Sequence, residues 1–430
     1  MRFLQWIWGG GALSLCWAAS AFDVPSDWML GLDDTLIDQY HGSFNHSRPD
    51  GPNSFVSTPE NSYSNVLGLN LGHQYSDHGE WWLRTETIRG IPLSQGGGLG
   101  ALTNNDMQRT MNNYFQTYLA EAFWHGYWSW GEMSQSDPST VGAFTRLKGT
   151  RELGVVVGKL SLLDYFDTNS YAGRNDSQFM NWCFMASCGF DYAADLRGYT
   201  LGGAVLLDWD AWSVRAGWFA MPVVPNGLIL NTQMAQQYQL DFEVERRWPG
   251  GDIKLLGYQT QMNLASYVTA NQLPGPVSIV NVPSVPTHRG GAGLNAQQEI
   301  VPGVGVFARA FWTGGQSETM AFAEVDRSQS MGISLDGLLW SRSLDGVGVG
   351  WVRNDINSAR QTFLTNGNLD LFIGDGYLSY GAETALEAYY RWGLNSHLAI
   401  TLDDQWIENP AYNQLRGPIQ VVAMRVHYTY

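Results

Sequence analysis

The sequence predicts an all-β protein, namely a transmembrane antiparallel β-barrel of about sixteen strands with an inward-folded constriction loop. Three observations indicate this fold. Apolar and polar residues alternate in short segments along most of the chain, the last segment alternates up to Tyr430, and no stretch after Ala21 is apolar enough for a membrane-spanning helix. Period-two alternation is typical of strands that present one apolar and one polar face.

The alternation is clearest in Gln237–Arg246, where Tyr, Leu, Phe and Val alternate with Gln, Asp and two Glu residues. Ala211–Met221, Val304–Trp312 and Glu383–Trp392 repeat the pattern. A soluble sandwich also alternates, but these apolar faces begin or end with Trp or Tyr, as the aromatic girdles of a membrane barrel require. The girdle residues expected are Trp81, Trp212, Trp218, Tyr238, Trp312 and Trp392.

The C-terminal segment Gln420–Tyr430 alternates and ends on an aromatic residue. A spanning barrel must close so that no strand edge meets lipid, and a last strand that reaches the final residue indicates such closure. The connections are uneven, as in barrels: Trp248–Gly251 is short, whereas Gly42–Ser62 and Ser266–Arg289 are long.

The first residues set the expected compartment. Met1–Ala21 has one positive charge, an apolar run and an Ala-Ser-Ala end, which predicts a cleaved secretory signal, with the barrel in 22–430. Removing it changes the formal charge from −16 to −17. Such acidity argues against nucleic-acid binding and against a cationic membrane-surface helix. It indicates either solubility of the loops or a lumen that tolerates cations better than anions.

The residues predict no enzyme, metal or cofactor. The motifs of serine hydrolases, zinc proteases and nucleotide-binding loops are absent, and Asp164 and Asp167 lack the spacing of an EF-hand. Cys183 and Cys188 are the cysteines that remain after the signal. In an oxidising periplasm they form either a disulfide or two buried thiols.

One long stretch, Gly158–Leu201, departs from the alternation. A loop of this length is usually functional or disordered, and its many aromatic and charged residues do not fit disorder. We therefore expect about residues 163–198 to fold into the barrel and narrow it.

Several motifs occur together: Gly158–Phe166 (GKLSLLDYF), Gln178–Trp182 (QFMNW), Asp195–Thr200 (DLRGYT), Ala321–Ser328 (AFAEVDRS), Gly374–Tyr380 (GDGYLSY) and Glu408–Arg416 (ENPAYNQLR). In this order they resemble the carbohydrate-selective porins of the OprB type from the Gram-negative outer membrane. The resemblance implies a sixteen-stranded porin that admits sugars by passive diffusion past inward-folded loops. The cysteine pair departs from that pattern, and so does the connection Trp124–Arg151, which is expected to be longer than usual.

Sugar passage requires aromatic rings for the CH faces of a pyranose and planar charged groups for its hydroxyls, bound weakly enough to release. We expect two groups of residues to meet this need, one on the loop and one on the wall. The loop candidates are Asp164, Asp167, Phe179, Trp182, Tyr192, Asp195 and Arg197, and the wall candidates are Arg84, Glu86, Arg215, Arg309, Glu324, Asp326 and Arg327. The alternative for the loop aromatics is a packing core, and for the loop charges it is salt bridges to the wall.

Three functions stay open at this point. The first is selective diffusion of monosaccharides such as glucose or of small oligosaccharides. The second is a general, cation-preferring diffusion pore, and the third is a barrel with a role in envelope structure or export. The expected partners are sugars and outer-membrane lipid with lipopolysaccharide, and the sequence leaves open whether the chain assembles as a homotrimer.

Overall fold

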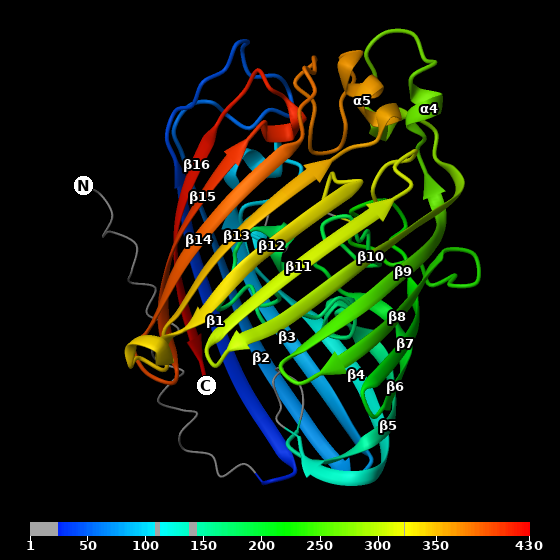
Figure 1. Cartoon of the computed structure of the whole chain (residues 1–430). Coiled ribbons are helices and arrows are strands. Elements are labelled where there is room, and N and C mark those ends of the chain that lie inside the picture. The colour runs from blue at the N-terminus through cyan, green and yellow to red at the C-terminus, as the bar shows by residue number, and fades with distance from the viewer. Residues whose placement is uncertain (1–24, 108–111, 137–143, 322) are drawn as a thin grey trace.

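The computed structural model describes residues 25–107, 112–136, 144–321 and 323–430. The predicted signal, Met1–Ala21, lies outside these residues. Within them, sixteen antiparallel strands close into one barrel in which each strand pairs with its sequence neighbours and β1 pairs with β16 (Figure 1). The predicted fold class is therefore confirmed.

The strands from β1 to β5 have 13 to 24 residues, and the later strands have 9 to 17. Their bounds are β1 Trp28–His41, β2 Glu60–Ser76, β3 Gly79–Ile91, β4 Asn112–Gln135, β5 Leu147–Leu160, β6 Thr200–Trp209, β7 Trp212–Ala220, β8 Tyr238–Trp248, β9 Gly251–Leu264, β10 Val285–Val301, β11 Val304–Thr313, β12 Arg327–Asp336, β13 Gly346–Asp355, β14 Glu383–Gly393, β15 Leu398–Glu408 and β16 Ile419–Thr429.

Short helices lie in the connections. They are α3 Trp182–Met185, α4 Tyr267–Ala270 and α5 Ser358–Thr365, with 3-10 turns η1 Leu93–Gly96, η2 Leu162–Asp164, η3 Ile279–Asn281, η4 Gly337–Trp340 and η5 Pro410–Tyr412. No helix in the described ranges combines the length and the apolar character needed to cross a bilayer.

Alternation along each strand separates an outer apolar face from the lumen, as β8 shows. Leu240 and Phe242 are exposed on the outside, whereas Asp241 and Glu243 are buried on the inside. Long connections such as 42–59 and 356–382 lie at the end that carries α4 and α5, and short ones such as 249–250 lie at the opposite end (Figure 1).

One expected connection is wrong. Trp124–Arg151 is mostly strand, because β4 continues to Gln135 and β5 begins at Leu147. Polar residues and four glycines within the segment resembled a loop, but Trp124, Trp128 and Trp130 keep the period of two and lie on one face of an extended strand.

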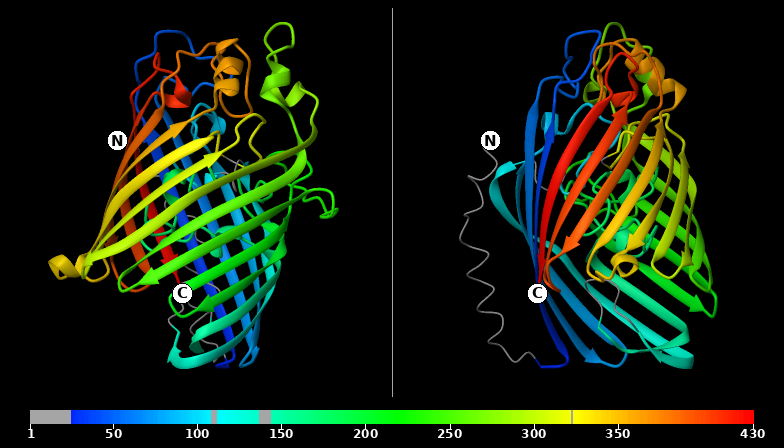
Figure 2. Two further views of the ribbon diagram at one scale, coloured as in Figure 1. Left: turned by 45° about the vertical axis from the view of Figure 1, so that its right-hand side comes forward. Right: turned by 60° about the vertical axis from the view of Figure 1, so that its left-hand side comes forward.

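The segment between β5 and β6, residues 161–199, is coiled inside the barrel (Figures 1 and 2). It covers the 163–198 range expected for the constriction loop. Phe179 packs on Phe184 of the same loop at 4.8 Å between ring centroids, and on Phe307 and Tyr389 of the wall at 5.6 and 5.0 Å. A disulfide joins Cys183 to Cys188, with Cα atoms 4.7 Å apart, so the bridged alternative holds.

Glycines on the inner wall make room for these rings. A Cβ atom at Gly350 of β13 would lie 2.7 Å from Phe184 and 3.0 Å from Phe179. Gly346 faces the lumen on the same strand, but a Cβ atom there would meet only the carbonyl oxygen of Leu335, at 3.8 Å.

We expect Gly350→Ala to loosen the docked loop by about 1–3 kcal/mol, because the added methyl overpacks two rings. Gly346→Ala is the matched control on the same face. Limited proteolysis of the folded barrel should cut within 161–199 faster in Gly350→Ala than in Gly346→Ala or the unchanged chain. Equal cleavage of all three proteins would contradict the close fit.

A second prediction concerns Glu318, in the connection between β11 and β12. Burial raises its pKa to about 7, although its Oε1 accepts a hydrogen bond of 2.7 Å from the amide of Ala265. Since the folded state holds this proton more tightly than the unfolded state, Glu318 opposes folding more strongly as pH rises from about 4.3 through 7. Local stability should therefore fall over that window.

Glu318→Gln should remove this pH dependence, because the amide side chain carries no charge to desolvate. The measurement is amide hydrogen exchange around Ala265 between pH 5 and 8, corrected for the intrinsic exchange rate. Protection that is independent of pH in the unchanged chain would argue against the raised pKa.

Candidate functional site

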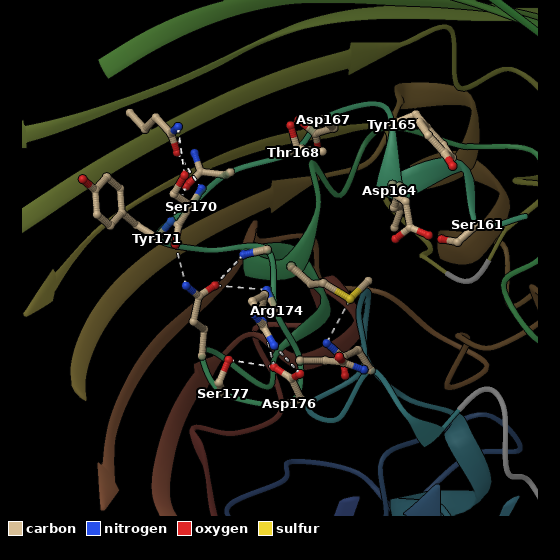
Figure 3. Close-up of a pocket in the computed structure, with 18 of the residues that line it drawn as sticks. Ser161, Asp164, Tyr165, Asp167, Thr168, Ser170, Tyr171, Arg174, Asp176 and Ser177 are labelled. Carbon is tan, nitrogen blue, oxygen red and sulfur yellow. Dashed lines mark hydrogen bonds and ion pairs between the residues drawn. The ribbon is translucent and has the colours of Figure 1, made fainter. Parts of the chain in front are cut away.

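The loop and the inner wall enclose a lumen cavity of about 1210 Å³. Its loop side is lined by a run of polar residues that includes Asp164, Ser170, Arg174 and Asp176 (Figure 3). Its wall side comes from inward residues of β1, β3, β5 and β7–β9, among others. We therefore take this cavity as the candidate functional site.

On the wall, Arg84 of β3 is held by three partners. Its guanidinium donates to both carboxylate oxygens of Asp33, at 2.9 and 3.1 Å, and to Asn70 Oδ1 at 3.0 Å. Nε donates to Glu86 Oε1 at 3.1 Å. The bidentate pair fixes the plane of the guanidinium, so Arg84 lies at the cavity as a preorganised donor.

Glu86 lies behind Arg84 and does not line the cavity. It is fully buried and accepts hydrogen bonds from the hydroxyls of Tyr118 and, at 2.7 Å, Tyr199. Arg197 stacks over the ring of Tyr118 at 4.0 Å and lines the cavity. Glu86 therefore positions the arginine, whereas Arg197 is at the pore surface.

A second cluster of paired charges lies on the wall formed by β7–β9. Arg215 pairs with Glu243 and, at 2.9 Å, with Glu245, and Lys254 pairs with Asp252 at 2.7 Å. Arg215, Glu245, Lys254 and Asp252 all line the cavity. The wall thus alternates donors and acceptors along the lumen.

The loop contributes an aromatic pair to the same cavity. Trp182 and Tyr192 stack with ring centroids 6.2 Å apart and planes 10° apart, and both line the cavity. The amide of Trp182 donates to the Leu102 carbonyl at 3.0 Å, which ties the pair to the connection between β3 and β4. Phe179 does not line the cavity, so its role is in the packing core.

Several predicted charges anchor the loop. Arg309 is 3% exposed and donates to the carbonyls of Phe184 and Asp167, at 2.6 and 3.2 Å. Asp167 accepts from Ser187 N at 2.5 Å and also reaches the cavity. Asp195 accepts from the amide of Arg197 at 2.9 Å, and burial raises its pKa. Asp195 also lies 3.9 Å from Lys159 Nζ of β5, which is the salt bridge to the wall expected as the alternative for this loop charge. Arg309, a wall candidate, holds the loop in the same way, because its Nε lies 3.5 Å from Asp167 Oδ1.

The expected Glu324/Asp326/Arg327 cluster does not face the pore. Glu324 and Asp326 are buried and pair with Arg360 of α5, beneath the loops. Arg327 is exposed and lies opposite Trp312, which faces outward. The prediction that Arg327 lines the pore was wrong. Arg327 is the first residue of β12, so no strand residues precede it whose alternation would show which way its side chain points.

Asp164 lines the cavity at the start of the loop, next to the half-buried Tyr165, whose pKa desolvation raises well above its usual value. Farther along, Arg174 and Asp176 form a bidentate pair at 3.1 and 2.8 Å. Burial raises the pKa of Asp176, but attraction to Arg174 outweighs it and holds that pKa well below its usual value.

Some lining residues escaped the sequence reasoning, among them Asp33, Glu121, Arg146, Lys148, Arg174, Asp176 and Lys254. Alternation within β1 and β9 could have found Asp33 and Lys254. Alternation could not predict that a second segment, 99–107, also lies inside the barrel. The carbonyl of Thr103 in this segment accepts hydrogen bonds from the side chains of Gln39 and Gln405, at 3.1 and 2.8 Å.

Stacking rings beside planar donors and acceptors in a wet cavity can bind and release a polyhydroxylated solute. Among the described residues, no group of three or more His, Cys, Asp or Glu side chains is arranged to hold a metal ion.

Comparison with solved structures agrees with the barrel fold. Pseudomonas putida OprB, in its high-pH structure, aligns with a TM-score of 0.68 at 15% identity, covering 98% of this chain and 97% of that one. The outer membrane channel DcaP of Acinetobacter baumannii aligns with a TM-score of 0.51 at 6% identity, covering 95% and 99%. At these identities the likeness shows the fold alone.

No curated protein matches the chain. The family model described as "Carbohydrate-selective porin, OprB family" matches residues 65–430, which is most of the chain. A channel family of this kind is not an enzyme family. The chain is a member of the OprB family of carbohydrate-selective outer-membrane porins.

Proposed function

We propose that this porin admits monosaccharides such as glucose, and also small oligosaccharides, by passive diffusion through the lumen cavity. The observation that carries the proposal is that the Trp182–Tyr192 pair and the Arg84 cluster line one cavity. The aromatic pair would contact the apolar face of a pyranose, and Arg84, Arg197 and Arg215 would donate to its hydroxyls.

The wall residues favour neutral solutes. Arg84 and Arg215 are already paired with carboxylates, so they offer hydrogen-bond donors with little net charge. A sugar exchanges its hydration for these fixed groups at many weak points, and it can therefore leave again.

We also propose how the chain is exported, what it contacts in the membrane and how it assembles. Removal of Met1–Ala21 would follow export, and the outward apolar band supports contact with lipid and lipopolysaccharide. We also propose assembly as a homotrimer, which charged side chains within the outward band of β1–β3 support.

A general cation-preferring pore is the second candidate, because thirteen Asp and Glu residues but only eight Lys and Arg residues line the cavity. Single-channel conductance in planar bilayers, titrated with glucose, other hexoses and a disaccharide, separates the two. Concentration-dependent block by some sugars supports selective passage, whereas an open channel indifferent to every sugar supports the general pore.

Trp182→Ala should raise the sugar concentration needed for half-maximal block about 3- to 10-fold, because one aromatic contact contributes a binding free energy of that size. Trp218→Ala, on the outer face of β7, is the control, since that residue cannot reach the lumen. The block constant from the same titration is the readout. Block that is unchanged in Trp182→Ala would remove the aromatic pair from the proposal.

Arg84→Ala should leave Asp33 and Glu86 without their cation and so raise the cation selectivity of the pore. The reversal potential in a KCl gradient should shift toward that of K⁺, and sugar block should weaken. Arg84→Lys keeps the positive charge but loses the planar, two-pronged donor group of the guanidinium. It should therefore leave the ion selectivity near its original value while still weakening the sugar block.

The heat-modifiable mobility of each Arg84 variant on gels checks that the barrel has folded. A folded Arg84→Ala pore with unchanged selectivity and unchanged block would contradict the assigned role.

A further inference from the structure

The connection between β12 and β13, residues 337–345, differs from its neighbours at the same end of the barrel. It has nine residues, whereas 210–211, 249–250, 302–303 and 394–397 have two to four. It contains η4 and projects sideways from the wall, as the yellow coil at the lower left of Figure 1 and of the left view in Figure 2 shows. We call residues 337–345 the lateral connection.

The lateral connection presents three leucines on its surface. Leu338 is 65% exposed, Leu339 is 50% exposed and Leu344 is 42% exposed. Leaving so much apolar area in water is unfavourable, and a group of exposed apolar side chains marks an interaction surface.

Ring contacts place the lateral connection on the outer side of the wall. The rings of Trp340 and Tyr390 have centroids 6.4 Å apart, and the Arg342 guanidinium lies 6.0 Å from the ring centroid of Trp392. Tyr390 and Trp392 keep the period of Leu386 along β14, and all three are exposed on its outward face. The lateral connection therefore continues the outward apolar band of the barrel.

The polar groups of the lateral connection bind one another. The amide of Gly337 donates to the Asp345 carbonyl at 3.0 Å, and the amides of Arg342 and Asp345 donate to the carbonyls of Gly337 and Arg342, both at 2.8 Å. The Asp345 carboxylate accepts from the Arg342 guanidinium at 2.6 and 3.1 Å, from the Tyr390 hydroxyl, and from the Gly393 amide at 3.0 Å. Such internal pairing is what a segment needs where water is scarce.

We propose that the lateral connection is a membrane anchor, which inserts Leu338, Leu339 and Leu344 among the acyl chains of phospholipids in the periplasmic leaflet. The short connections of outer-membrane barrels lie at the periplasmic end, and Trp and Tyr rings mark the level of the headgroups. Trp340 lies at that level beside Tyr390, and Arg342 extends from it toward the phosphates. The anchor depends on the outer-membrane location of the family and not on the passage of sugars.

The first test measures where residue 339 lies in a bilayer. Leu339→Cys in the full-length protein is labelled with a bimane maleimide and reconstituted in phosphatidylcholine vesicles that contain this protein alone. Cys183 and Cys188 are bridged and buried, so they do not compete for the label. The matched control is Ser396→Cys in the neighbouring short connection, and Leu402→Cys, on the outward face of β15, marks the acyl region.

Lipids that carry bromine on their acyl chains should quench the label at 339 and at 402 but not at 396. Iodide in the water should quench the label at 339 about three-fold less than the label at 396. Equal quenching by iodide at 339 and 396 would show a hydrated turn. A label at 339 that neither reagent quenches would show that a second copy of the chain covers it, and either result overturns the proposal.

The second test measures what the leucines contribute. Leu338→Ser combined with Leu339→Ser should lower the folding equilibrium constant in the same vesicles about ten-fold, because both side chains lose their transfer out of water. Urea titration followed by heat-modifiable mobility on gels gives this constant. A double variant as stable as the unchanged chain would overturn the proposal, since leucines exposed to water contribute nothing that serine lacks. Sugar block of single channels tests the transport function separately.

Discussion

Closure of the sheet is the constraint on which the rest of this structure depends. β1 pairs with β16 from Asp33 opposite Thr429 to His41 opposite Val421, so the barrel has no edge at which backbone groups would meet lipid. Once the register is fixed all the way round, the period of two assigns each strand residue to the lumen or to the outside. Arg84 and Leu83 are neighbours in sequence, yet one contacts the cavity and the other contacts lipid.

The sequence was therefore most informative where that period applies. Alternation predicts that Arg84 and Arg215 face the lumen, and both line the cavity. Arg327 does not line it, because Arg327 is the first residue of β12 and no preceding strand residues define its face. Inside the loop the sequence could identify aromatic residues but not sort them, because Phe179 packs into the wall and Trp182 reaches the cavity only through three-dimensional folding. Glu86 shows the same limit on a strand: alternation gives its direction, but not that Tyr118 and Tyr199 cover it.

The inward loop depends on the wall as much as the wall depends on closure. A chain segment inside a wet lumen needs partners for its carbonyls and amides, and the inner face supplies them: Glu387 accepts from the amides of Met180 and Asn181, and Arg309 donates to two loop carbonyls. Wall glycines then let rings approach the sheet closely, as at Gly350. These anchors hold the Trp182–Tyr192 pair in place at the cavity.

Pairing of charges also explains how one lumen can be both highly charged and suited to neutral solutes. An isolated arginine would attract anions strongly and hold them, which opposes passage. Arg84 keeps the directional hydrogen-bond donors of its guanidinium. The neighbouring carboxylates of Asp33 and Glu86 offset its positive charge, so it attracts distant anions only weakly. An ion gains little from such a pair and still pays its desolvation, whereas a sugar exchanges hydrogen bonds with water for hydrogen bonds of the same kind. The acidic excess elsewhere in the cavity acts on ions over longer distances and is weakened by salt, so the two effects separate when ionic strength is raised.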